Sequence, residues 1–74
     1  MKSETKQQQI DRVSVSLQEL ASQITEADKG FVMFNLNKSI DTVRRYLKGE
    51  VANLETGVRM IEILRQRIKE RQAA

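Results

Sequence analysis

Apolar residues recur at helical spacing in the first third of the chain. Five of them follow one another at intervals of three or four residues, which places them on one face of an α-helix. They are Ile10, Val13, Leu17, Leu20 and Ile24. We therefore predict an amphipathic helix from about residue 6 to residue 23. Residues 1–5 have nothing to bury and are expected to fray.

A second helix is predicted to begin after Thr25. Thr25 and Asp28 have the spacing of a capping box, with Asp in place of Glu, and Glu26 adds a favourable charge to the first turn. The segment that follows contains Gly30, which costs about 1 kcal/mol relative to Ala inside a helix. We expect this helix to bury some combination of Phe31, Val32, Phe34 and Leu36.

A turn and a third helix are predicted next. Asn35 and Asn37 interrupt the apolar pattern, and asparagine tolerates the left-handed conformation of tight turns. Ser39 is a good N-cap for a helix over about 40–48, and Gly49 stands where helices commonly end. The inward positions of this helix are Val43, Tyr46 and Leu47, and its opposite face carries Arg44, Arg45 and Lys48.

A fourth helix is predicted to run from its cap at Asn53 to about Arg71, with Glu55 in its first turn. Its expected buried stripe consists of Leu54, Val58, Ile61, Leu64 and Ile68. The cations of the segment RQRIKER near its end are interpreted as structural, because they complement the helix dipole. No segment alternates with the period of a strand. The sequence therefore predicts an all-α fold, a single small four-helix domain over residues 1–74.

The composition argues against catalysis. The 74 residues include no histidine and no cysteine, which removes the commonest general base and metal ligand and every thiolate. Ser39 has no base to activate it and is better explained as a cap. We expect no enzymatic activity, no cofactor, no metal and no small-molecule substrate.

The chain also lacks the roughly 18 consecutive apolar residues of a membrane span. Together with the absence of cysteine, which fits a reducing compartment, this predicts a cytoplasmic protein with no membrane partner. The charge is unevenly divided. Residues 1–37 carry four Lys and Arg against five Asp and Glu, a net charge of −1, whereas residues 38–74 carry nine against five, a net charge of +4. This asymmetry draws attention to polyanionic partners.

Residues 25–66 resemble the helix-turn-helix DNA-binding domains of the phage-repressor type, often called the Cro and repressor class. The resemblance lies in the order of a short apolar helix, an Asn turn, SIDTVRRYLKG, a loop and NLETGVRMIEILRQR. The matching positions are Ser39, Thr42, Val43, Gly49, Leu54 and Glu55. The sequence departs from the family at three positions, where Met33 replaces a small residue, Asn37 the turn glycine and Lys38 an apolar residue.

The resemblance implies a transcriptional regulator that binds double-stranded DNA. Its helix-turn-helix lies at about 26–48, and its recognition helix, at about 39–48, enters the major groove. The implied groove-facing residues are Ser39, Ile40, Asp41, Arg44, Arg45 and Lys48. Arginine can donate two hydrogen bonds to guanine, and lysine or a helix N-terminus can hold phosphate. Val32, Leu36, Val43 and Tyr46 would hold the two helices of the motif together.

An alternative function is a helical adaptor or other protein–protein interaction module with no nucleic-acid partner. The apolar stripes of the first and fourth helices are spaced so that they could pair helices between chains, although cores of small bundles show the same stripes. We also predict a homodimer through the fourth helix, because Met60, Ile63 and Arg67 continue a flank beside its buried stripe. The alternative is that Met60 and Ile63 pack under the first helix. Pairing would give a regulator two half-sites on DNA.

Overall fold

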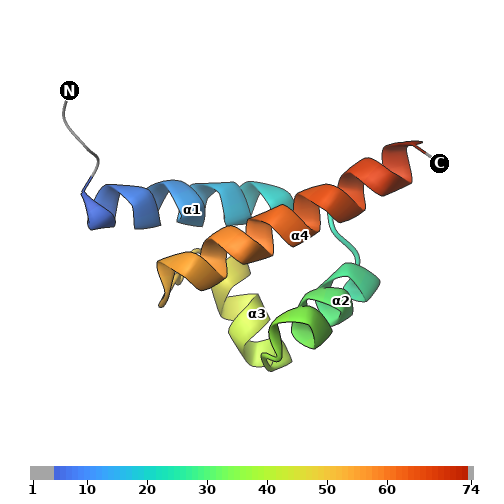
Figure 1. Cartoon of the computed structure of the whole chain (residues 1–74), viewed down its shortest axis with the longest axis horizontal. Helices are drawn as coiled ribbons and strands as arrows, with labels where there is room; N and C mark the ends of the chain where they lie inside the picture. Colours follow the sequence, from blue (N-terminus) through green and yellow to red (C-terminus); the bar gives the residue numbers. More distant parts are fainter. Residues whose placement is uncertain (1–4, 74) are drawn as a thin grey trace.

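Four helices form the structure, a computed structural model that describes residues 5–73. They are α1 (Lys6–Ala21), α2 (Glu26–Leu36), α3 (Ile40–Leu47) and α4 (Leu54–Ala73). Within the described range there is no strand. α1 and α4 lie side by side along the long axis of the molecule, and the shorter helices α2 and α3 lie together below them (Figure 1). The predicted all-α class and the four helices are confirmed.

Local sequence signals account for the start of α1. The side chain of Thr5 accepts a hydrogen bond from the backbone N–H of Gln8 at 3.1 Å, and the Gln8 side chain accepts one from the N–H of Thr5 at 2.9 Å. Thr5 is therefore an N-cap, and the prediction that it frays is wrong. The rest of that prediction concerns residues 1–4, which lie outside the described range. α1 ends two residues earlier than predicted, where the Ser22 hydroxyl donates to the carbonyl of Glu19.

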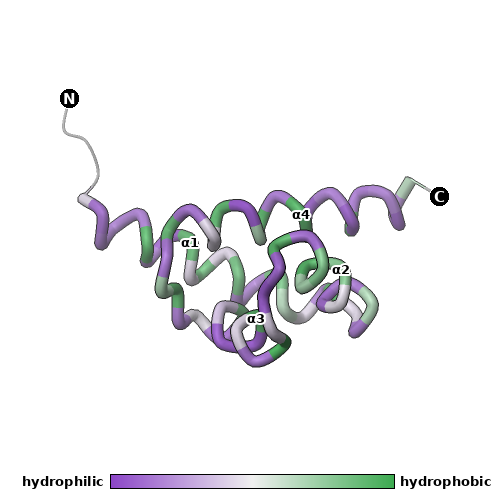
Figure 2. Tube along the Cα trace, turned by 60° about the horizontal axis from the view of Figure 1, so that its bottom comes forward, coloured by the Kyte–Doolittle hydropathy of each residue, from purple (hydrophilic) through white to green (hydrophobic). Residues whose placement is uncertain are grey.

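The hydrophobic core lies where the four helices meet. Figure 2 shows apolar residues alternating with polar ones along the helices, as expected when only one side of each helix is buried. The predicted inward positions of the third helix are confirmed, and so are Val13, Leu17 and Leu20 of the first helix. Ile10 is only partly buried, and Ile24 packs against the core from beyond the end of α1. The buried apolar residues of the described chain are Val13, Leu17, Leu20, Val32, Val43, Tyr46, Leu47, Met60, Ile61 and Leu64.

The inward face of α2 contains two of the four residues from which the prediction drew, Val32 and Leu36. Val32 is fully buried, but the exposed fraction is 42% for Phe31 and 87% for Phe34. The buried line of this helix runs through Asp28 and Val32, which are four residues apart, and Leu36 is partly buried further along the same line. An aspartate, Asp28, therefore shares the inward side of α2 with Val32, which apolar periodicity did not predict.

The predicted buried stripe of α4 is confirmed except at Val58, because Ile61 and Leu64 are buried and Leu54 and Ile68 pack against the core. Met60 is fully buried within the single chain and Ile63 is partly buried against the core, whereas 39% of Val58 is exposed. Gly57 permits a close approach of the two helices at this level, because a Cβ atom there would lie only 2.7 Å from Cγ1 of Val13. α4 thus packs closely against α1 on the side of Gly57 and Met60. The surface predicted for a dimer, which depended on Met60, is not exposed.

Candidate nucleic-acid interface

A three-residue turn, 37–39, joins α2 to α3. Asn37 lies in the left-handed region with φ 54° and ψ 47°, and its N–H donates to the carbonyl of Met33. The N–H of Lys38 donates to the same carbonyl at 3.1 Å. Asparagine therefore does here what glycine does in many turns between helices, and the sequence predicted this correctly.

The start of α3 is capped as predicted. The Ser39 hydroxyl oxygen accepts a hydrogen bond from the backbone N–H of Thr42 at 3.2 Å and lies 3.1 Å from the Thr42 hydroxyl. Asp41 lies in the first turn, where its negative charge favours the helix N-terminus. The two residues thus stabilise the end of α3 that follows the turn.

The end of α3 is tied to the other helices by three polar contacts. The Tyr46 hydroxyl oxygen accepts the N–H of Asn53 at 3.0 Å. The side chains of Gln18 and Ser14, both on α1, donate to the carbonyls of Lys48 at 3.1 Å and Gly49 at 2.9 Å. These contacts hold the end of α3 against α1 and against the loop before α4, and the buried Val43 packs the inward side of α3 into the core.

The opposite face of α3 is open to solvent. Asp41, Arg44, Arg45 and Lys48 are exposed, Ser39 is exposed at the cap, and Ile40 is partly buried. Within residues 5–73, neither arginine nor Lys48 forms an ion pair. The structure therefore brings the predicted residues onto one end and one side of a single helix, where three cations and the carboxylate of Asp41 are exposed.

Lys29 adds a fourth cation that the sequence did not single out. A hollow between α1, α2 and α3 is lined by Lys29, Arg44 and Lys48, with Ala21 and Leu47 as its apolar part. No acidic side chain lines this hollow, although the Lys29 ammonium pairs with Glu26 at 3.2 Å. Sequence reasoning missed Lys29 because its proximity to Arg44 arises only from the packing of α2 on α3.

A buried ion-pair cluster fixes the other side of α2. Asp28 has no exposed surface, and its carboxylate accepts hydrogen bonds from Arg67 at 2.9 Å and from Arg71 at 2.8 and 2.6 Å. Arg71 also donates to the carbonyl of Gln23 at 2.8 Å. The Arg67 guanidinium carbon lies 4.4 Å from the centre of the Phe31 ring, within cation–π distance. These two arginines have a structural role, but they hold α2 through an ion pair with Asp28, whereas the prediction was that they complement the helix dipole.

The charged form of Asp28 is strongly favoured. Burial by itself raises the pKa of this carboxyl, but the backbone N–H of Thr25 and the two guanidinium groups lower it by more. The result is a pKa of about 2, below the ordinary value of 3.8. Asp28 is therefore ionised at neutral pH and joins α2 to α4 as a charged group.

Comparisons with protein-family models, curated proteins and solved structures give no match for the chain. In residues 5–73 no group of three or more Asp and Glu side chains is arranged to hold a metal ion. The same residues include no helix long and apolar enough to cross a membrane. The geometry of α2, the turn and α3 is accordingly the basis for assigning a function.

Proposed function

We propose that the chain is a DNA-binding transcriptional regulator in which α2, the turn 37–39 and α3 act as a helix-turn-helix. The observation that carries the proposal is the exposed face of α3, where Arg44, Arg45 and Lys48 lie opposite the fully buried Val43. An α-helix fits the major groove of DNA, and exposed cations without acidic partners suit a polyanion. A short turn with one left-handed residue is typical of such helix pairs.

The two arginines have different surroundings, which suggests different tasks. Arg44 lines the hollow with Lys29 and Lys48, where three cations around a small apolar surface suit a backbone phosphate. Arg45, the next residue along α3, lies on a different side of the helix and does not line that hollow. We assign Arg45 to a base edge, where a guanidinium can donate two hydrogen bonds to guanine.

The test is fluorescence anisotropy with random duplex DNA at several salt concentrations. Replacing Arg44, Arg45 and Lys48 together by alanine should weaken binding and reduce the slope of log K against log salt by about one for each phosphate that the protein no longer neutralises. Arg59→Ala with Lys69→Ala is the control, because it removes exposed cations from α4 instead. An unchanged slope in the triple variant would exclude α3 from the interface.

Single substitutions distinguish phosphate binding by Arg44 from base recognition by Arg45. Lys29→Ala and Arg44→Ala should weaken binding to random DNA and to a selected site by the same factor. Arg45→Ala should lose roughly 1–3 kcal/mol on a site selected from a random pool and much less on random DNA. Equal losses for Arg45→Ala on both would reassign it to phosphate. No binding by the wild type at low salt would instead favour the alternative, a protein interaction module.

A further inference from the structure

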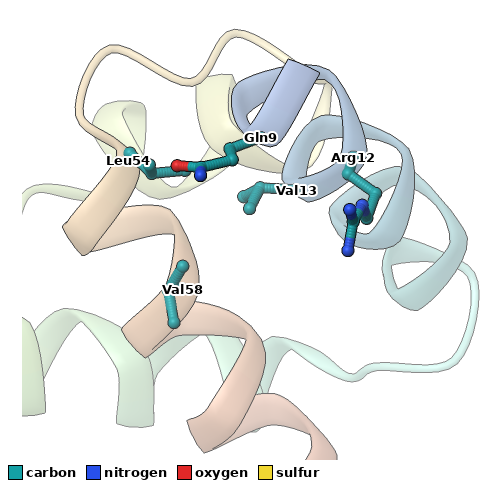
Figure 3. A pocket seen from close by; sticks show the side chains of 5 residues that line it. All are labelled: Gln9, Arg12, Val13, Leu54 and Val58. Carbon is teal, nitrogen blue, oxygen red and sulfur yellow. The ribbon is translucent and has the colours of Figure 1, made fainter. Parts of the chain in front are cut away.

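An apolar groove follows the seam between α1 and α4, away from the cations of α3. Figure 3 shows its middle section, a hollow lined by Gln9, Arg12 and Val13 of α1 and by Leu54 and Val58 of α4. Leu54 also lines the section next to the start of α4, and Val13 and Val58 also line the section towards Arg65. The three sections therefore form one groove, which extends for about 16 Å along α4.

The floor of this groove is apolar surface that one chain leaves uncovered. Val58 belongs to the stripe predicted to be buried, yet 39% of it is exposed, and Leu54 is only partly buried. Gly57 brings α4 so close to Val13 of α1 that no further side chain fits between the helices at this level. The groove is consequently shallow and lined by side chains already held in place.

The two walls of the groove carry opposite charges at matching levels. Lys6 on α1 and Glu55 on α4 line the same end. Arg12 on α1 and Glu62 on α4 line the same section further along, with Arg65 of α4 beyond them. Among the residues that line the groove, the α1 side thus carries the cations Lys6 and Arg12, and the α4 side carries Glu55 and Glu62, followed by Arg65.

We propose that this groove binds a second copy of the chain, related by a two-fold axis that runs along the groove. Rotation by 180° about this axis exchanges the two walls and keeps each level along the groove, so that α1 of one copy faces α4 of the other. Lys6 of each copy then faces Glu55 of the other, and the two Val58 side chains are covered. A two-fold interface requires a surface whose two halves are complementary, because each half of one copy contacts the other half of its partner.

The proposal replaces the dimer surface expected from sequence, because it uses the side of α4 opposite to the buried Met60. It does not rest on the proposed DNA binding, since no residue of α3 lines the groove. A chain that binds no DNA can still form this dimer, and a monomer can still bind DNA.

The test is sedimentation equilibrium of the full chain from micromolar to millimolar concentration. The wild type should approach twice the chain mass of 8.5 kDa. Val58→Asp should weaken the dimer by a factor on the order of 100, because each interface would bury two carboxylates that repel one another in place of two apolar side chains. The matched control is Val15→Asp, at a valine that is 54% exposed on α1 and does not line the groove, which should leave the mass unchanged.

Charge reversal tests the orientation of the two copies. Lys6→Glu and Glu55→Lys should each weaken the dimer, because each places like charges opposite one another in both facing pairs. An equimolar mixture of these two variants should form a mixed dimer again, because every facing pair then has opposite charges. Circular dichroism checks that all variants keep their helices. A wild-type monomer throughout the concentration range, a Val58→Asp dimer of wild-type strength, or a mixture that stays monomeric would each overturn the proposal.

Discussion

Asp28→Asn is the sharpest test of how the helices are held together. The substitution keeps the size of the side chain and removes only its charge from the cluster with Arg67 and Arg71. The asparagine still offers one oxygen to the guanidinium groups, but its amide turns N–H donors toward groups that are themselves donors. We expect the variant to fold with lower stability, because both arginines are partly exposed and water can solvate part of their charge.

The size of the effect follows from the pKa of Asp28. Its lowering from 3.8 to about 2 corresponds to about 2 kcal/mol in favour of the ionised form in the folded state. A domain of this length has a free energy of unfolding of roughly 4–11 kcal/mol, so the loss is a substantial fraction. In urea, with an m-value near 1 kcal/mol/M, the midpoint should fall by about 2 M.

The pH dependence makes the test specific. The folded-state pKa is below the unfolded-state value, so this stabilisation is present above pH 4 and is lost as the pH falls through about 2. The difference in unfolding free energy between wild type and Asp28→Asn should therefore shrink between pH 4 and pH 2. Urea titrations followed by circular dichroism at pH 7, 4, 3 and 2 measure it. A difference below about 0.5 kcal/mol at pH 7, or one independent of pH, would refute the role assigned to the cluster.

Two other substitutions test the positions of α3 and of the loop after it. Val43→Asp should unfold the chain or lower its melting temperature sharply, because it places a carboxylate at a fully buried site, whereas the exposed Val15→Asp should have little effect. An unchanged melting temperature for Val43→Asp would mean that α3 is rotated from its described position. Gly49→Ala should cost about 1–3 kcal/mol in urea denaturation, since φ is +102° there and the new Cβ would collide with Gln18. Gly30→Ala, whose Cβ meets nothing within 4 Å inside α2, is the matched control and should stabilise by up to about 1 kcal/mol.

The sequence predicted those parts of the fold that depend on neighbouring residues. The turn at Asn37, the cap at Ser39 and the inward side of α3 were all correct, because caps and periodicity act within one or two turns of helix. The burial of Asp28 was not predicted, because its partners Arg67 and Arg71 lie on another helix 39 and 43 residues away.

Rotation of a helix about its axis was harder to predict. In α4, apolar residues occupy more than one side, and periodicity alone favoured Val58 over Met60. Gly57 allows a close approach of α1 on the side of Met60, and no local pattern in the sequence predicts such an approach. Sequence reasoning about the candidate site was limited in the same way. All six implied residues lie on one segment of the sequence, whereas Lys29 is near them only because α2 packs on α3.

The contact between Asp28 and Arg71 also has a consequence for folding kinetics. Most contacts in small helical proteins join residues close in sequence, which is why such proteins fold quickly. Here the contact that fixes α2 closes a loop of 43 residues, and closing long loops costs chain entropy before the contact forms. The helical turns of α2 and α3 need only local interactions, whereas the orientation of α2 requires the far end of α4 to dock. The helix pair proposed to bind DNA is thus completed by residues far from it in sequence.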